Sequence, residues 1–208
     1  MLTKLKRKVQ EIVSAEARLI HKAGLKPNIV SAMGAILGLL SGIAYWAAGV
    51  SLPDLNAYRI HLSTATVLLM LSGFSDALDG ALARIYGEAT VMGGFLDSLL
   101  DRYVDSAVLC GLILGGLCDN FWGFIALVGS LLTSYVRARS EAADVPMETV
   151  GVMERAERII VIIAASIVSV ILAETIALKF SIMFLAVASN LTVIQRTLYF
   201  RRRVRQKR

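Results

Sequence analysis

The chain is poor in cysteine, proline and histidine, with two, three and two of these residues among 208. Cys110 and Cys118 lie eight positions apart on one predicted helix, about 12 Å along its axis, so they cannot pair with each other. His21 and His61 lie far in sequence from the acidic cluster described below. A zinc or iron centre, which would draw on histidine or cysteine ligands, is therefore not expected at that cluster.

Charged residues are also missing from six long apolar stretches. The chain is 56% hydrophobic, and its mean hydropathy of +0.66 exceeds what a soluble domain needs. A membrane-spanning helix requires about 20 mostly apolar residues, and each uncharged stretch reaches this length once its polar flanks are included. The sequence therefore predicts an all-α integral membrane protein with no attached soluble domain and six transmembrane helices, at about 28–50, 60–84, 92–117, 121–140, 151–173 and 177–200.

Residues 1–27 precede the first predicted span and are too charged for a cleaved signal peptide. Their apolar side chains recur at helical spacing: Leu2, Leu5, Val9, Ile12, Val13 and Ile20. This pattern indicates an amphipathic helix on the membrane surface, with a solvated helix as the alternative. The predicted organisation is a juxtamembrane helix at 1–27, a six-helix membrane domain at 28–200 and a basic tail at 201–208.

Basic residues are distributed unevenly between the two sides of this predicted membrane domain. The side that would hold both termini carries all but three of the 22 lysines and arginines; Arg59 and Lys179 fall in outer loops and Arg102 in the third span. Cytoplasmic loops carry the excess of Lys and Arg, so both termini and the functional site are predicted to face the cytoplasm at the cell membrane. The basic tail suits membrane lipids with anionic head groups. No aromatic or glycine-rich RNA-binding element accompanies it, so no nucleic-acid partner is expected.

Four aspartates interrupt two of the apolar stretches, in the pattern Asp76-x2-Asp79-Gly80-x2-Ala83-Arg84-x8-Gly93-x3-Asp97-x3-Asp101. A carboxylate at the centre of a bilayer costs roughly 2.5–3.5 kcal/mol on insertion scales. The i, i+3 and i, i+4 spacings put each pair on one face of its helix, and the short connection makes the two helices antiparallel neighbours. Convergent carboxylates suit a hard cation such as Mg²⁺ or Mn²⁺ that also binds substrate phosphate. The pattern predicts an intramembrane metal site.

Three alternatives to a catalytic site follow from the same residues. In the first, the acids form ion pairs that tie helices together; only Arg84 and Arg102 are expected near enough to pair with five acids including Asp105, so the charges would not balance. In the second, the aspartates bind the ion of a divalent-cation transporter, which would need a polar path continuing across the membrane. The outer halves of the two helices, Ile60–Ser75 and Ser106–Leu117, contain no charged residue. In the third, the protein is a membrane scaffold without activity. Such a scaffold would not need Arg84 or the glycines at motif spacing.

The complete aspartate pattern resembles the signature of the CDP-alcohol phosphotransferase family, with all eight fixed positions present. The resemblance implies a homodimeric membrane enzyme of six helices preceded by a surface helix, which uses Mg²⁺ or Mn²⁺ and moves a phosphatidyl-type group from a CDP-lipid to an alcohol, releasing CMP. It further implies that Asp76, Asp79, Asp97 and Asp101 bind the metals and that Asp101 is the general base. By the same resemblance, the CDP-lipid would contact Asn28, Gly80, Ala83 and Arg84.

Arginines at three further helix ends bear on the choice of acceptor alcohol. Several guanidinium groups around one pocket suit a dianionic phosphate, and the candidates are Arg137, Arg139, Arg155 and Arg196. The strings Ser134–Arg139 and Val150–Arg158 are similar to those of phosphatidylinositol-phosphate and archaetidylinositol-phosphate synthases, although the position of Arg137 is often lysine there. That likeness implies inositol phosphate as acceptor and CDP-diacylglycerol or CDP-archaeol as donor. The same chemistry with glycerol 3-phosphate is the nearest alternative.

Overall fold

The computed structural model describes residues 27–147 and 150–206, and this part of the chain is helical with no strand. The amphipathic helix predicted before residue 27 lies outside the described residues. Six helices follow at the predicted positions: α2 (Pro27–Val50), α3 (Leu55–Tyr86), α4 (Val91–Leu114), α5 (Asn120–Glu141), α6 (Arg155–Leu172) and α7 (Ile176–Gln206). Three bounds differ from the prediction by four residues or more: α3 begins earlier, at Leu55, α6 begins later, at Arg155, and α7 continues into the tail as one helix that ends at Gln206.

The connection between α3 and α4 is short and capped at both ends. Gly87 ends α3 in the left-handed conformation at φ +66°, which a residue without a Cβ adopts readily. Thr90 then caps α4, and its Oγ1 accepts a hydrogen bond from the Gly93 amide at 2.9 Å. These two caps reverse the chain within a few residues, and so they place the acidic end of α3 beside the first half of α4.

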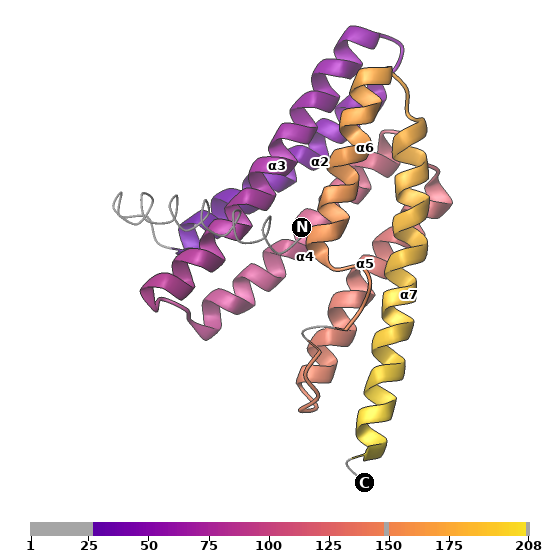
Figure 1. Cartoon of the computed structure of the whole chain (residues 1–208). Coiled ribbons are helices and arrows are strands. Elements are labelled where there is room, and N and C mark those ends of the chain that lie inside the picture. Colours follow the sequence, from indigo (N-terminus) through magenta and orange to yellow (C-terminus); the bar gives the residue numbers. More distant parts are fainter. Residues whose placement is uncertain (1–26, 148–149, 207–208) are drawn as a thin grey trace, which may run out of the picture.

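The helices form two groups joined by α6 (Figure 1). In one group α2 packs on α3 and α4, and in the other α5 packs on α7. Helix α6 contacts both α3 and α7, while α4 contacts α5. Buried side chains such as Tyr45, Leu112 and Ile182 fill the core, and the Tyr45 hydroxyl lies 2.8 Å from Ser166 Oγ across the α2–α6 contact. The ends of α3 and α4 diverge from those of α5 and α7 at the side where the chain finishes.

Helices α2 and α4 approach each other closely because glycines face one another. A Cβ atom on Gly111 would overlap the carbonyl oxygen of Gly42, and one on Gly42 would lie 2.5 Å from the carbonyl oxygen of Ala107. Small residues allow membrane helices to approach backbone to backbone. Here they bring α4, which carries two of the four motif aspartates, against the helix that begins beside the site.

Four of the described helices are long and apolar enough to cross a membrane: α2, α3, α5 and α7. The two others, α4 and α6, each contain several charged residues, among them Asp97, Asp101 and Arg155 of the site. Many large apolar side chains point outward, for example Ile36, Phe180 and Val187, each more than half exposed. A surface of this kind suits lipid rather than water. The finding supports a multi-pass membrane protein.

Candidate active site

The side chains of three motif aspartates, from α3 and α4, converge on one another. Asp76 lies toward the end of α3, and Asp97 and Asp101 lie one turn apart on α4. Each contributes a carboxylate oxygen, and these oxygens lie within 4.8 Å of one another. Carboxylates gathered so closely repel each other unless cations lie between them.

The fourth motif aspartate, Asp79, lies beside this group but outside it. It lines the same small cavity as Asp76, Asp97 and Asp101, and only 6% of its surface is exposed. Its Oδ2 atom is buried and has no hydrogen-bond partner among the described residues. An unpartnered buried carboxylate oxygen is costly, and an all-oxygen donor set of this kind fits a hard divalent cation. The four residues therefore fit the predicted metal.

Arg155, the first residue of α6, provides positive charge within the acidic group. Its Nη1 lies 2.9 Å from Asp76 Oδ2 and 2.9 Å from Asp101 Oδ1, and its Nε lies 3.4 Å from Asp105 Oδ1. The start of the helix is fixed because Glu157 accepts a hydrogen bond from the Glu154 amide at 3.0 Å. The sequence predicted a phosphate ligand at Arg155; in this structure its guanidinium faces carboxylates at the wall of the main cavity.

The main cavity has a volume of about 510 Å³ and opens between the two groups of helices. All four motif aspartates line it, together with the arginines Arg84, Arg102, Arg137, Arg155, Arg158 and Arg196. Acidic and basic side chains from five different helices thus line this one cavity, which we call the chamber. Such a chamber can hold a cation on one wall and a phosphate on another.

A second cavity of about 250 Å³ adjoins the first, and Asp79, Gly80, Arg84 and Asp97 line both. Asn28 and Ala83, both predicted to contact the CDP-lipid, line the second cavity. A Cβ atom on the motif glycine Gly93 would lie 3.0 Å from Asn28 Oδ1, so a side chain there would crowd the asparagine. The structure thus brings together all four residues predicted to contact the donor.

The other predicted phosphate-binding arginines occupy different surroundings. Arg137 lines the main cavity and pairs with Glu141 at 2.9 Å. Arg196 is buried: its Nε donates to the Val150 carbonyl and its Nη1 to the Thr133 carbonyl, both at 2.7 Å. Arg139 is exposed and is not among the described residues that line the cavity. The structure therefore brings Arg137, Arg155 and Arg196 to the chamber and leaves Arg139 outside it.

Comparison with known proteins gives this site a family. The family model described as CDP-alcohol phosphatidyltransferase matches residues 25–194, which include the aspartate cluster and every residue that lines the two cavities except Arg196. The chain belongs to this family.

Several relatives support the assignment. An archaetidylinositol phosphate synthase of Pyrococcus horikoshii is 34% identical over 204 residues, covering 98% of each chain, and one of Methanothermobacter thermautotrophicus is 42% identical over 69% of this chain and 73% of its own. The crystal structure of Mycobacterium tuberculosis phosphatidylinositol phosphate synthase with CDP-DAG bound superposes with a TM-score of 0.76 at 29% identity, covering 91% of this chain and 94% of that one. A second structure of that enzyme, at a TM-score of 0.75, contains manganese and citrate. With the carboxylate cluster found here, it indicates a divalent-metal site in this CDP-alcohol phosphatidyltransferase.

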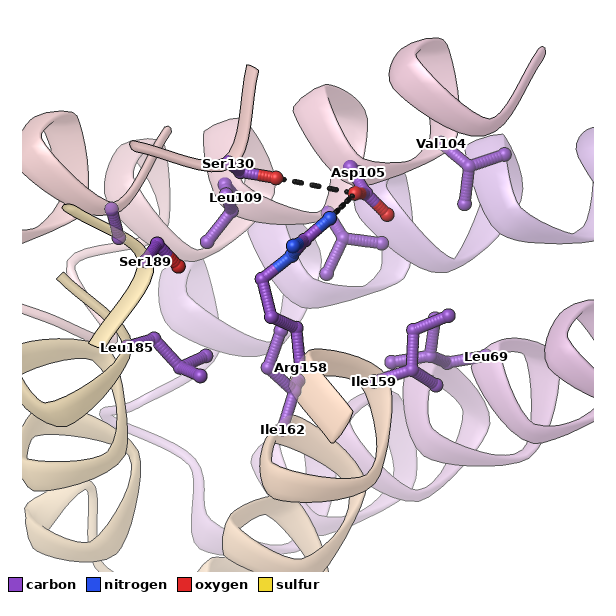
Figure 2. A pocket seen from close by; sticks show the side chains of 12 residues that line it. Leu69, Val104, Asp105, Leu109, Ser130, Arg158, Ile159, Ile162, Leu185 and Ser189 are labelled. Carbon is purple, nitrogen blue, oxygen red and sulfur yellow. Dashed lines mark hydrogen bonds and ion pairs between the residues drawn. The ribbon is translucent and has the colours of Figure 1, made fainter. Parts of the chain in front are cut away.

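Two residues of the chamber were assigned no role from the sequence. Asp105 lies one turn beyond Asp101 and pairs with Arg158 of α6 through a contact of 2.7 Å (Figure 2). The expectation that only Arg84 and Arg102 lie close enough to pair with the acids is therefore wrong. The partners supplied by α6 lie 50 or more residues away along the chain, so their proximity arises only from tertiary packing. The sequence signal available was the i, i+3 spacing of Arg155 and Arg158 at the start of an apolar helix.

Proposed function

We propose that this CDP-alcohol phosphatidyltransferase transfers a phosphatidyl or archaetidyl group from a CDP-lipid to an inositol phosphate. The products are the lipid inositol phosphate, made for phospholipid biosynthesis, and CMP. The observation that carries this proposal is the single chamber in which motif aspartates face several arginines. A dianionic acceptor needs such cationic side chains, whereas free inositol, serine or choline does not. The names of the archaeal and mycobacterial relatives support the same acceptor.

Asp76, Asp79, Asp97 and Asp101 are the proposed ligands of Mg²⁺ or Mn²⁺. When bound, such an ion polarises phosphoryl oxygens and offsets the negative charge that grows on them. The orphaned oxygen of Asp79 and the closely spaced oxygens of the three other carboxylates support this assignment.

The donor is proposed to occupy the second cavity with its diphosphate directed toward the aspartates. Arg84 holds the diphosphate through its forked donors. Gly80 and Ala83 lack bulk and let the nucleotide approach the backbone of α3, while Asn28 contacts it from α2. All four residues line this cavity, which supports the placement. The lipid chains stay in the bilayer and enter between helices.

Asp101 is the proposed general base. It accepts the proton of the acceptor hydroxyl while the hydroxyl oxygen bonds to the lipid-bearing phosphorus and the bond from that phosphorus to CMP breaks. Arg137, Arg155 and Arg196 hold the acceptor's phosphate near this carboxylate. Two facts support the arrangement: these arginines line the same chamber as Asp101, and Arg155 Nη1 lies 2.9 Å from it. A role for Arg139 remains a prediction from the sequence.

The proposed setting is a homodimer in the cell membrane, with six spans in each chain and with both termini and the chamber on the cytoplasmic side. The positions of the arginines support this orientation, because Arg84, Arg137 and Arg196 all line the chamber and all belong to the side rich in basic residues. In this arrangement α4 and α6 cross the membrane with their charged faces turned to the chamber and their apolar faces turned to lipid or to other helices.

The proposal is tested by CMP release from purified enzyme supplied with Mg²⁺ or Mn²⁺ and with CDP-diacylglycerol or CDP-archaeol. Inositol phosphate, glycerol 3-phosphate, free inositol and serine are compared as acceptors, with Asp101→Asn as the control. We expect CMP only with inositol phosphate, and none from the Asp101 variant. Release only with glycerol 3-phosphate would keep the chemistry and overturn the acceptor. The absence of release with every pair would overturn the function.

A further inference from the structure

Asp105 is a mostly buried acid that belongs to the site but not to the aspartate motif. It follows Asp101 by one helical turn on α4, and only 11% of its side chain is exposed. Its carboxylate is not part of the three-carboxylate group formed by Asp76, Asp97 and Asp101. Its charge is therefore available for a purpose other than metal binding.

The carboxylate of Asp105 joins three helices. Its Oδ2 accepts hydrogen bonds from Ser130 of α5 at 3.2 Å and from Arg158 of α6 at 2.7 Å, and Figure 2 shows both donors converging on it. Its Oδ1 lies 3.4 Å from Nε of Arg155, also on α6. Ser130 and Arg158 thus hold one oxygen in place while the other faces Arg155.

Arg155 has carboxylate partners of two kinds. Its Nη1 contacts Asp76 and Asp101, which are the proposed cation ligands, and its Nε contacts Asp105, which is not one. A carboxylate that binds a cation has less negative charge left to hold a guanidinium. The contact with Asp105 does not depend on that cation. While Asp105 holds Nε, Nη1 faces Asp76 and Asp101, which line the chamber.

We propose that Asp105 is the positioning residue for the acceptor's phosphate. It holds Arg155 by its Nε, so that the remaining donors of the guanidinium meet the phosphate of the bound acceptor. Arg158 and Ser130 keep the Asp105 carboxylate in its rotamer. The inference rests on the proposed function, in which Arg155 binds that phosphate.

The test compares the kinetics of Asp105→Asn with those of the wild type, with CMP release as the readout and acceptor and CDP-lipid varied separately. Charge-assisted hydrogen bonds contribute enough that KM for inositol phosphate should rise about 10-fold or more. KM for the CDP-lipid should stay unchanged. The dissociation constant of inositol phosphate, measured by calorimetry in detergent without turnover, should rise in parallel. Asp105→Glu, which keeps the charge, should recover part of the loss.

Two further variants keep the test decisive. Ser130→Ala removes one hydrogen bond and leaves the carboxylate, so its effect on acceptor KM should be much smaller. Asp105→Asn combined with Arg158→Met removes the buried unpaired cation that the single substitution would leave. In this double variant Arg155 keeps Asp76 and Asp101 but still lacks the carboxylate at its Nε. This double variant should retain the weak acceptor binding.

Three results would overturn the inference. The first is an acceptor KM that changes neither in Asp105→Asn nor in the double variant with Arg158→Met. The second is a loss confined to kcat with both KM values intact, which would place the effect on the chemical step at Asp101. The third is an equal rise of both KM values, which a general structural defect would produce. Wild-type turnover with glycerol 3-phosphate in place of inositol phosphate would count against the proposed function alone, because the same measurements can then be made with that acceptor.

Discussion

Asp79 and Asp105 are acids of one chamber, the first buried and the second mostly buried, and the charges around them have opposite signs. Asp79 lies among other carboxylates and keeps one oxygen without a partner among the described residues. Asp105 lies between two arginines and a serine that donates to it. The buried charge of Asp79 destabilises the fold unless a cation binds beside it. The charge of Asp105 stabilises the fold because it neutralises arginines that would otherwise be buried without a partner.

Asparagine at these two positions should therefore change stability in opposite directions. In metal-free protein, Asp79→Asn removes a buried, poorly compensated charge, and a gain of 1 kcal/mol would raise the Tm by roughly 2–4 °C. Asp105→Asn leaves Arg158 as a buried cation without a carboxylate, at a cost of about 3–5 kcal/mol, and should lower the Tm. Thermal unfolding in detergent with EDTA measures both.

The addition of Mn²⁺ tests whether a bound metal compensates the charge of Asp79. The wild type should gain stability from the metal, and Asp79→Asn should gain less because one ligand is gone. If Asp79→Asn had a lower Tm than the wild type in EDTA, the Asp79 carboxylate would not be destabilising in the metal-free protein, and the explanation would be wrong.

Arg137 and Arg139 form a matched pair two positions apart on α5. Arg137 lines the chamber and Arg139 does not, and both are surface-accessible guanidinium groups near the same helix end. Arg137→Ala should raise the acceptor KM, by about 10-fold for the loss of one charge-assisted contact, and Arg139→Ala should raise it much less. Steady-state kinetics with inositol phosphate decide between them. Equal effects would favour the prediction from the sequence, in which both bind the phosphate.

At the scale of the element, the packing of α2 on α4 depends on positions without side chains. A Cβ atom on Gly111 would meet the backbone of α2 at Gly42, and backbone cannot move aside as a flexible side chain does. Helix α4 carries Asp97, Asp101 and Asp105, so any shift of this helix moves three acids of the chamber together.

Gly111→Ala should destabilise the protein, since overpacking of a close contact typically costs about 1–3 kcal/mol. Gly73→Ala on α3 is the matched control, because its nearest neighbour would be Ile159 Cγ2 at 3.6 Å, an ordinary contact. That substitution also improves helix propensity and should leave the Tm unchanged or higher. Thermal unfolding in detergent compares them. Similar losses in both would show that glycine content, rather than the α2–α4 contact, sets the effect.

Helix length also matters at this scale. Helix α7 has 31 residues, which corresponds to about 46 Å at 1.5 Å per residue, against about 30 Å for the hydrocarbon layer. The excess lies at the basic end, where Arg203 and Arg205 close the helix. Residues 201–206, predicted as part of a separate tail, therefore continue α7 as one helix that projects from the bundle, as Figure 1 shows.

For the whole molecule, the arrangement of the helices sets which side of the membrane the chamber faces. The chamber lies between diverging helix ends, on the side where α7 finishes, and the turn between α2 and α3 lies at the other end of those helices. The proposed orientation can be tested with single cysteines introduced at these two ends, after Cys110 and Cys118 have been replaced.

Leu52→Cys, in the α2–α3 turn, should react with a membrane-impermeant maleimide in intact cells. Arg205→Cys, near the end of α7, should react only after the cells are opened, because positive charge near helix ends is retained in the cytoplasm. Mass-shift gels with both variants make the comparison. The reverse pattern would contradict a cytoplasmic chamber, and labelling of both from outside would contradict the five spans, an odd number, that the proposal places between them.

Much of this molecule follows from local sequence patterns. The six helices could be placed because apolar stretches and flanking polar residues recur within a single element. The convergence of Asp76 with Asp97 and Asp101 could be predicted because helical spacing and one short turn determine it. The ion-pair and hydrogen-bond partners of the arginines could not be predicted, because these partners depend on how helices distant in sequence pack together.

The sequence alone determined the membrane class, the helices, the family signature and the acidic cluster, because each depends on residues within one or two turns of each other or across one tight connection. Only the tertiary structure decided that Arg155 and Arg158 face Asp101 and Asp105, that Arg196 donates to backbone carbonyls, and that Arg139 stays outside the chamber. The physical reason is that a buried charge takes the nearest opposite charge or carbonyl that packing provides. For the arginines of this chamber, several of those partners lie on other helices, some of them dozens of residues away along the chain.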